Sequence, residues 1–191
     1  MPVTRNQFRI IGGRHRGRKL HFPGTEGLRP TPDRVRETLF NWLMPVIAGA
    51  RCLDLFAGSG ALGIEAVSRG ASRVVLVDCH AAVARQLRDN LALLDAGNAG
   101  VVQADALVFL AGTPEIFDVV FLDPPYGSEL LAPCIARLEP GGWLADPAWI
   151  YLEAPAGEAL PALPANWTVQ RSKRAGQVGY HLLRRTAPQP A

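Results

Sequence analysis

Residues 54–63 decide the fold, and they read Asp54-Leu55-Phe56-Ala57-Gly58-Ser59-Gly60-Ala61-Leu62-Gly63. The run begins inside a short apolar stretch, 52–56, and continues into a stretch with helical character, 61–68. Glycines between a strand and the start of a helix let a ligand lie directly against the backbone. The run therefore predicts the first strand–turn–helix unit of an α/β nucleotide-binding fold.

Downstream of this run, short apolar strands alternate with helices. We expect strands over 52–56, 73–77, 101–103, 119–122 and 149–152, separated by helices over 61–68, 81–94, 106–111 and 130–138. Two further strands, 167–173 and 178–183, flank a turn that leaves no room for a helix. Such alternation predicts parallel strands joined by right-handed crossovers, with helices on both faces. The fold class is α/β: a doubly wound, mostly parallel, seven-stranded, Rossmann-like sheet with an antiparallel C-terminal hairpin.

Upstream of the run, residues 8–20 have β-prone ends around a glycine turn and are typical of a small hairpin. Thr31 is expected to cap the helix that follows, with Pro32 at its first position and Pro45 at its end. The chain thus begins with a small extension, a β-hairpin and a helix, ahead of the sheet.

Charge is strongly segregated along the chain, although the net charge is only +3. Residues 1–36 carry nine basic and two acidic residues, whereas residues 37–170 carry six basic and fifteen acidic ones. Residues 171–191 carry five basic residues and no acid. An acidic middle between basic ends favours a cationic ligand in the middle and a polyanion at the ends.

Composition disfavours several classes of protein. No stretch approaches the roughly 18 uninterrupted apolar residues of a membrane span, and no apolar segment follows the first basic residue as in a secretory signal. Cys52, Cys79 and Cys134 are odd in number and lack metal-ligand spacing, so we expect free thiols and no metal. These features predict a cytoplasmic protein without a membrane partner.

Carboxylates follow four of the predicted strands. Asp54, Asp78, Asp105 and Asp123 stand at or just after successive strand ends, and that edge of an open parallel sheet binds ligands. A carboxylate beside a pyrophosphate would cost up to about 4 kcal/mol, whereas the ammonium and sulfonium of S-adenosylmethionine attract one. S-adenosylmethionine is therefore the predicted cofactor. A dinucleotide-dependent oxidoreductase is the alternative, because the glycines also match G-x-G-x-x-G.

The predicted cofactor site divides along the ligand. Asp78 suits the two ribose hydroxyls, and Asp105 suits the adenine amine, with the Ala106 N–H on the ring. For Asp105, a solvated loop acid or a helix N-cap is the alternative. The candidate cofactor-binding residues are Asp54, Phe56, Ala57, Gly58, Ser59, Gly60, Asp78, Asp105 and Ala106.

The most specific motif is Asp-Pro-Pro-Tyr at residues 123–126. The Asp123 side chain and the Pro124 carbonyl can each accept one N–H of a nucleobase amine, which turns the nitrogen lone pair toward the methyl donor. Pro124 and Pro125 fix the backbone, and Tyr126 offers an aromatic face to a base pulled out of its stack. These four residues are the candidate catalytic residues for methylation of an exocyclic amine.

Basic residues near the N-terminus are the candidate RNA contacts: Arg14, Arg16, Arg18, Lys19, Arg29, Arg34 and Arg36. Phosphate contacts position a nucleic acid without reading its sequence. A short basic hairpin without a separate target-recognition domain favours a structured RNA or a ribonucleoprotein over bulk DNA.

Several blocks together resemble the RsmD family, and the resemblance covers nearly the whole chain. They are residues 9–20, 28–43, 53–63, 123–126 and 175–178. The resemblance implies a class I, S-adenosylmethionine-dependent 16S rRNA (guanine(966)-N(2))-methyltransferase. The enzyme would be bacterial, cytoplasmic and monomeric, and would act on 16S rRNA or the small ribosomal subunit particle. It also implies that Asp54, Gly58 and Gly60 hold the methionine part and that residues 123–126 face guanine N2.

We expect three parts in the chain. Residues 1–44 would form a basic, RNA-contacting extension, 45–185 the methyltransferase domain and 186–191 a flexible tail. One residue departs from the family pattern: His80 stands where an acid or amide is frequent, which leaves the ribose hydroxyls to Asp78.

Three alternatives remain open at this level. The Asp-Pro-Pro-Tyr motif alone does not distinguish guanine N2 from adenine N6 or cytosine N4, in RNA or DNA. The oxidoreductase already mentioned is the second alternative, and a non-catalytic RNA-binding assembly factor is the third.

Overall fold

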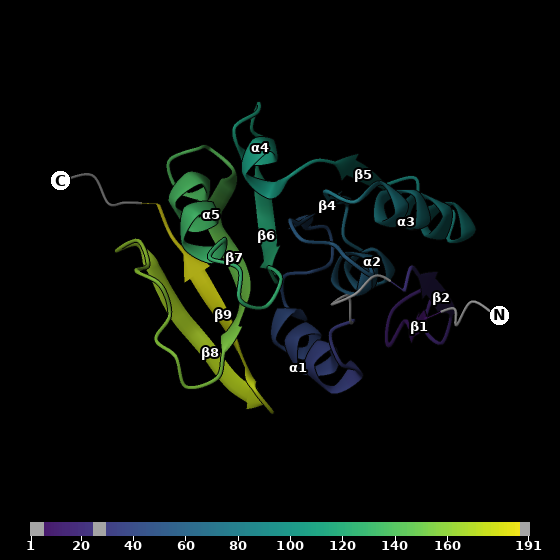
Figure 1. The fold of residues 1–191 in the computed structure, drawn as a ribbon, viewed down its shortest axis with the longest axis horizontal. Coiled ribbons are helices and arrows are strands. Elements are labelled where there is room, and N and C mark those ends of the chain that lie inside the picture. The colour runs from purple at the N-terminus through teal and green to yellow at the C-terminus, as the bar shows by residue number, and fades with distance from the viewer. Residues whose placement is uncertain (1–5, 25–29, 188–191) are drawn as a thin grey trace.

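A twisted sheet runs through the middle of the molecule, as Figure 1 shows for a computed structural model that describes residues 6–24 and 30–187. Its strands are β3 (Arg51–Asp54), β4 (Arg73–Asp78), β5 (Ala99–Gln103), β6 (Phe117–Leu122), β7 (Leu144–Pro155), β8 (Trp167–Ala175) and β9 (Val178–Arg185). They lie in the order β5-β4-β3-β6-β7-β9-β8. All neighbours from β5 to β7 are parallel, whereas β9 is antiparallel to β7 and to β8. The predicted fold class is confirmed.

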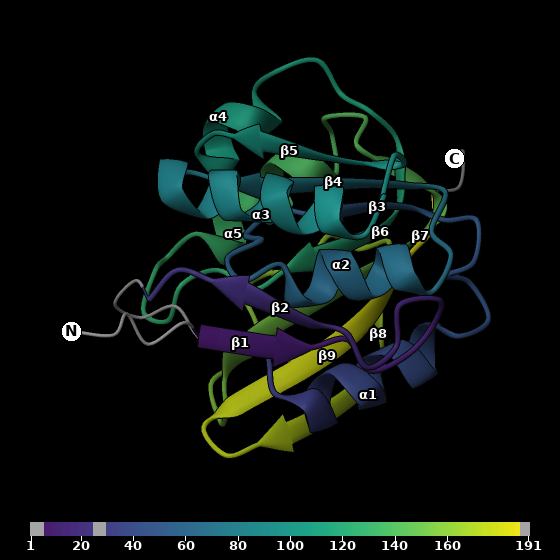
Figure 2. The ribbon, with the colours of Figure 1, turned by 90° about the vertical axis from the view of Figure 1, so that its right-hand side faces the viewer.

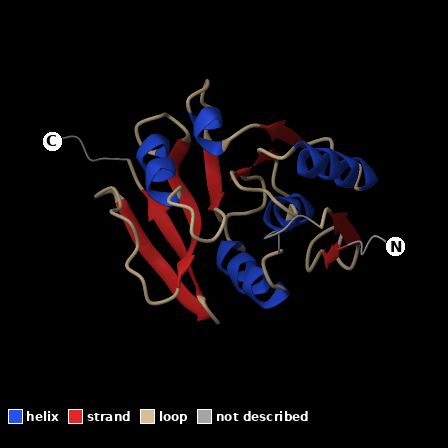
Figure 3. Cartoon of the chain, in the orientation of Figure 1, coloured by secondary structure: helices blue, strands red, loops and turns tan. Residues whose placement is uncertain are grey.

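Helices cover both faces of the sheet, and Figure 3 shows them in blue on either side of the red strands. They are α1 (Asp33–Leu43), α2 (Ala61–Ser68), α3 (Ala81–Leu93), α4 (Ala106–Leu110) and α5 (Leu131–Leu138). Successive strand residues point to opposite faces. In β4, Val74 and Leu76 pack in the cluster of α1, α2 and α3, whereas Val75 and Val77 pack with α4 and α5. Continuous apolar strands are typical of a parallel sheet covered on both sides.

Two boundaries differ from the sequence prediction. Strand β7 is much longer than the expected 149–152, because its pairing with β9 extends from Ala148 to Pro155. The N-cap of α1 is Pro32, without a side-chain capping bond, so the prediction that Thr31 caps this helix is wrong. The Thr31 carbonyl instead accepts a hydrogen bond from Arg36 Nε at 3.0 Å, and its hydroxyl lies 3.5 Å from Asp123 Oδ2.

The N-terminal hairpin pairs β1 (Asn6–Arg9) with β2 (Lys19–Phe22), and Figure 2 shows it on the outside of α2. Phe8 and Leu20 are buried in the same cluster as α1 and α2. The hairpin turn packs against the end of α2, where Ser68 Oγ donates to the Gly12 carbonyl at 2.6 Å. Gly13 has a φ of +76°, and a Cβ there would lie 1.9 Å from the Ser68 carbonyl oxygen. Only glycine fits this contact.

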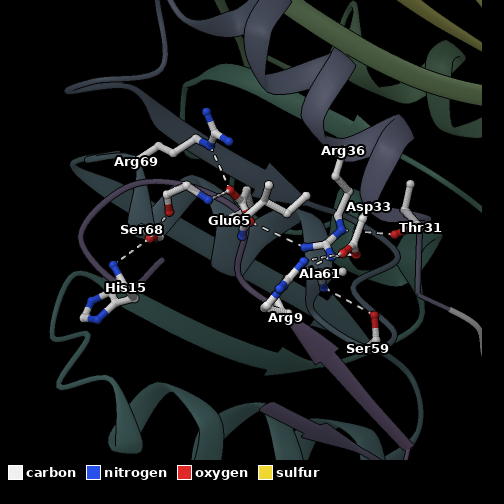
Figure 4. A network of polar contacts seen from close by, with 12 residues as sticks. Arg9, His15, Thr31, Asp33, Arg36, Ser59, Ala61, Glu65, Ser68 and Arg69 are labelled. Carbon is white, nitrogen blue, oxygen red and sulfur yellow. Dashed lines mark hydrogen bonds and ion pairs between the residues drawn. The ribbon is translucent and has the colours of Figure 1, made fainter. Parts of the chain in front are cut away.

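One buried carboxylate joins the hairpin, α1 and α2, and Figure 4 shows it among its partners. Glu65 is fully buried, and its Oε2 and Oε1 accept hydrogen bonds from Ile11 N at 2.9 Å and Gly12 N at 2.8 Å. The same side chain receives Arg69 Nε at 2.8 Å and Arg36 Nη1 at 3.4 Å. A buried charge persists only when it is paired and hydrogen-bonded, and Glu65 meets both conditions.

Arg36 is the buried partner of that carboxylate. Its side chain is 0% exposed, and Nη2 donates to the Arg9 carbonyl at 2.9 Å and to the Asp33 carboxylate. The prediction that Arg36 contacts RNA is therefore wrong, because the guanidinium is used inside the fold.

None of the helices in the described part of the chain has the length and apolar character that a membrane crossing requires.

Replacing Glu65 tests how much the network contributes to stability. Glu65→Ala leaves the Arg36 charge and two main-chain N–H groups without their acceptor, so we expect the free energy of unfolding to fall by about 3–5 kcal/mol. Urea titration followed by circular dichroism measures it. The control is Glu37→Ala on the exposed side of α1, which should change stability by less than about 0.5 kcal/mol. Equal effects of the two substitutions would contradict the role of the network.

Candidate active site at the carboxyl ends of the strands

The glycine turn lies between β3 and α2, as the sequence predicts. Its residues are Phe56, Ala57, Gly58, Ser59 and Gly60. Gly60 is the N-cap of α2 with a φ of +82°, and a Cβ there would lie 2.5 Å from the side chain of Leu87. Ser59 Oγ accepts a hydrogen bond from Ala61 N at 3.3 Å. The turn is thus held tightly on the helix, with its backbone at the carboxyl edge of the sheet.

Asp54 ends β3 beneath this turn. The residue is 2% exposed, and its Oδ2 accepts a hydrogen bond from Gly63 N at 2.9 Å. Burial and, to a smaller extent, the nearby Asp78 charge raise the pKa of Asp54 to about 7, against the lowering effect of the main-chain hydrogen bonds. No salt bridge to Asp54 forms among the described residues. A cationic ligand at this position would find a buried acid without a cation of its own.

Asp78 ends β4 and contacts the same turn. Its Oδ2 accepts from Gly58 N at 3.0 Å, and its Oδ1 accepts from His80 N at 2.8 Å. The His80 ring nitrogen Nδ1 lies 3.1 Å from Oδ1 and 3.4 Å from Cys79 Sγ. These contacts account for the close approach of the three side chains, whose donor atoms lie within 4.8 Å of one another. His80 therefore orients the predicted ribose acid.

Asp105 follows β5 and is the N-cap of α4. Its Oδ1 accepts hydrogen bonds from Leu107 N at 2.8 Å and Val108 N at 3.2 Å. The helix-cap alternative for this residue is thus present in the structure. Asp105 is exposed and Ala106 is buried. The adenine contact expected of the pair stays a prediction.

Asp123 follows β6 and lies on the same face of the sheet as Asp54. Each stands two positions after a strand residue of the α1–α3 cluster, Phe121 and Cys52 respectively, and alternate residues of a strand share a face. Burial and the neighbouring charges of Glu153 and Asp54 raise the pKa of Asp123 well above its usual range. The structure thus brings together Asp54 and Asp123, which are 69 positions apart in the sequence, at adjacent strands β3 and β6.

The rest of the motif is open to solvent. Tyr126 is 78% exposed, and Pro125 is exposed beside it. The Pro125 carbonyl accepts from Ser128 N at 3.0 Å, which closes a turn after the motif. The Pro124 carbonyl receives no main-chain hydrogen bond from the described residues. An aromatic face and a carbonyl oxygen are thus available to a ligand beside Asp123.

Sequence reasoning missed Glu153 and Tyr151 on β7. Tyr151 OH donates to Glu153 Oε1 at 2.6 Å, and Glu153 follows Leu152 just as Asp123 follows the paired Leu122, so the two acids are neighbours. Glu153 directly follows the predicted strand 149–152. The rule that singles out the four aspartates at strand ends would therefore have found it. No comparable sequence pattern indicates the contact of Thr31 with Asp123.

The predicted RNA-contacting residues lie in different places. Arg14, Arg16, Arg18 and Lys19 are exposed, but the hairpin turn packs at the C-terminal end of α2, where Arg14 N donates to the Ser68 carbonyl at 2.7 Å. That end of α2 is the one remote from the glycine turn. Arg29 lies outside the described residues.

Other basic residues lie closer to the strand ends. Arg34 is exposed in the first turn of α1, three positions after Thr31. Lys173 and Arg174 are exposed on β8, and they pair through Tyr180 and Gly179 of β9 with Glu153 and Ala154 of β7. They thus share the carboxyl edge of the sheet with Asp123.

Comparisons with known proteins agree with this geometry. A family model described as conserved hypothetical protein 95 matches residues 8–184. The chain is 57% identical over 183 residues to ribosomal RNA small subunit methyltransferase D of Escherichia coli K12, which covers 95% of this chain and 91% of that protein. It is 46% identical over 186 residues to the protein of the same name from Haemophilus influenzae, with 95% of each covered.

Among solved structures, the putative methyltransferase yhhF from Escherichia coli matches with a TM-score of 0.91 and 54% sequence identity. The match covers 96% of this chain and 100% of that one. The strand order and this match place the fold among class I methyltransferases.

The raised pKa of Asp54 makes stability depend on pH. Because the folded pKa of about 7 exceeds the ordinary value of 3.8, the folded state holds a proton that the unfolded state releases. The free energy of unfolding should therefore fall as the pH rises between those two values. In Asp54→Asn the fall should be shallower, as measured by urea titration across pH. Asp89→Asn, at an exposed position of α3, should retain the wild-type slope, and a wild-type slope in Asp54→Asn would refute the assignment.

Proposed function

Since the chain belongs to the RsmD family, whose model is described as conserved hypothetical protein 95, we propose that it methylates the exocyclic N2 amine of a guanine in 16S rRNA of the small ribosomal subunit. The methyl donor is S-adenosylmethionine. The observation that carries the proposal is the placement of Asp123 and the free Pro124 carbonyl beside the buried, unpaired acid of Asp54 at one edge of the sheet. The relatives named above support the choice of rRNA.

The site fits the proposed methyl donor in charge and shape. Asp54 offers a buried carboxylate to a cationic group, and the glycine turn offers backbone without side chains. Asp78 Oδ2 accepts from Gly58 N alone and can accept a ribose hydroxyl as well, whereas Oδ1 is held by His80. When bound, S-adenosylmethionine supplies an electrophilic methyl group on a sulfonium.

The residues at β6 prepare the amine for transfer. Asp123 and the Pro124 carbonyl accept its two N–H groups, so that the nitrogen lone pair is aimed rather than delocalised into the ring. Tyr126 stacks on the base, which is worth about 1–3 kcal/mol and offsets much of the energy that leaving the helix costs. Positioning of this kind is the main contribution that the protein makes to an in-line displacement.

The phosphate contacts fall into two groups by position. Arg34, Lys173 and Arg174 lie near the carboxyl edge and would hold the RNA next to the target base. The hairpin residues Arg14, Arg16, Arg18 and Lys19 lie at the far end of α2 and would bind a more distant segment. The proposed enzyme is a monomer that acts in the cytoplasm. Its substrate is either free 16S rRNA or the rRNA of the assembling small-subunit particle.

Methylation of rRNA lacking the modification tests the proposed function. We expect the purified protein to transfer labelled methyl from S-adenosylmethionine to small-subunit rRNA of an Escherichia coli strain deleted for methyltransferase D. Nucleoside mass spectrometry should identify N2-methylguanosine. Asp123→Ala should bind S-adenosylhomocysteine as wild type does, by calorimetry, yet transfer no methyl, whereas Asp89→Ala should be fully active. Methylated adenine N6 or cytosine N4 in the product would rule out the guanine assignment.

Removal of basic residues separates the two RNA-binding groups. Lys173→Ala with Arg174→Ala should lower kcat/KM and also reduce the salt slope of RNA binding, by roughly 0.7–0.9 for each phosphate that is no longer neutralised. The triple replacement of Arg14, Arg16 and Arg18 by alanine should also reduce the salt slope, but it should lower kcat/KM less than the double replacement does. Filter binding over a salt series and single-turnover methylation measure the two quantities. A triple variant whose kcat/KM falls further than that of the double variant would contradict the placement of Lys173 and Arg174 next to the target base.

A further inference from the structure

A second carboxyl group lies directly behind the proposed amine-binding acid. Strands β6 and β7 are parallel neighbours with Leu122 opposite Leu152, so the residues that follow, Asp123 and Glu153, stand side by side. Both point to the face occupied by Phe121 and Tyr151, because the side chains alternate along each strand. Figure 1 shows β7 running beside the end of β6 and continuing past it.

The hydrogen-bond donors around Asp123 and Glu153 indicate which of the two carboxyls carries a proton. Tyr151 OH donates to Glu153 Oε1 at 2.6 Å, and the register of β6 and β7 places the Glu153 carboxyl beside that of Asp123. Thr31 Oγ1 lies 3.5 Å from Asp123 Oδ2 on the other side. Two carboxyl groups can share a hydrogen bond only when one of them carries a proton. Since the tyrosine hydroxyl stabilises a negative Glu153, the proton belongs on Asp123.

The surroundings favour a single negative charge on the pair. The titratable groups that face it are Asp54 on β3, Tyr151 on β7 and Tyr180 on β9. None of them is a cation, and no salt bridge to either carboxyl forms within the described parts of the chain. Two close carboxylates without a cation do not both ionise. Burial and the neighbouring negative charges raise the pKa of Asp123, in agreement with this arrangement.

We propose that Glu153 is a positioning residue that shares one proton with Asp123 and receives that proton when the amine is methylated. The inference rests on the proposed function. In the resting pair, neutral Asp123 presents Oδ2 as a carbonyl-type acceptor to one amine N–H, while its other oxygen donates to the negative Glu153. The aspartate thus acts as the oriented acceptor of the target amine.

The transfer step balances through the pair. The amine nitrogen forms its bond to the methyl carbon as the carbon–sulfur bond breaks, and the sulfur keeps that electron pair. The methylated nitrogen, now positive, gives a proton to Asp123 Oδ2, and Asp123 passes its original proton to Glu153. Both carboxyls end neutral, the secondary amine is neutral, and Glu153 later loses one proton to water. The single negative charge shared by the two carboxyls attracts the proton from the methylated amine of the nucleobase.

Glu153→Gln removes the proton acceptor while it keeps a side chain of the same shape. General-base contributions of this kind are worth about 10²–10⁴-fold in rate, so we expect kcat to fall at least about tenfold with KM for RNA and affinity for S-adenosylhomocysteine unchanged. The pH profile of kcat should also change. Wild type should lose activity at low pH, where Glu153 is already protonated and cannot accept a further proton, whereas in the variant this acid limb should lie at a different pH, because Asp123 alone then titrates.

Glu158→Gln is the matched control, since Glu158 is exposed in the segment after β7, and it should keep the wild-type rate and profile. If wild type is active and Glu153→Gln matches it in kcat and in pH profile, the inference is wrong and the proposed function stands. If wild type itself transfers no methyl to the rRNA, the proposed function fails.

Infrared spectroscopy of the ligand-free protein gives a second test that does not need activity. At a pH well above the Asp54 titration, wild type should show the carbonyl band of one protonated carboxyl. The band should disappear in Asp123→Asn and should shift or vanish in Glu153→Gln. A wild-type spectrum without the band, or a band that neither substitution alters, would overturn the inference, even if one variant were too unstable for kinetics.

Discussion

The buried carboxylate of Glu65 is the interaction on which the arrangement of this molecule depends. It accepts two main-chain N–H groups of the hairpin and the guanidinium groups of Arg36 and Arg69. Arg36 in turn holds the carbonyls of Arg9 and Thr31. One ion pair therefore fixes where the hairpin ends, where α1 begins and where Thr31 stands. Because Thr31 reaches Asp123, the same network extends to the edge where the chemistry is proposed.

This coupling changes how the N-terminal extension is understood. Its apolar residues, such as Phe8 and Leu20, share one cluster with α2, α3 and the sheet. The extension is thus packed as part of the core rather than attached to it, and its arginines divide into a buried structural group and an exposed one. The exposed arginines of the turn lie away from the strand ends. The charge segregation of the sequence is therefore spread over two distant surfaces, one at the hairpin turn and one at the turn between β8 and β9.

Much of this could be predicted from local patterns, and the failures have physical reasons. The strands, the glycine turn and the acids that follow strands depend on short-range periodicity, and the structure places Asp54, Asp78 and Asp123 at one edge. The burial of Arg36 depends on Glu65, 29 positions away, and no local pattern distinguishes a buried arginine from an exposed one. Thr31 has the residue type of a helix cap, but tertiary contacts to Arg36 and Asp123 place it one residue further out. Glu153 directly follows the predicted strand 149–152, so the rule that singles out acids at strand ends applies to it as well.

The central claim is that the edge formed by β3, β4, β6 and β7 presents carboxylates to a cationic methyl donor and to the amine of one base. The most direct measurement uses reconstituted small-subunit rRNA in which the target guanosine is replaced by inosine, which has the same ring but lacks the N2 amine. With labelled S-adenosylmethionine, the account predicts one methyl group for each guanosine-containing molecule and none for the inosine-containing one. Equal methylation of the two substrates would contradict it.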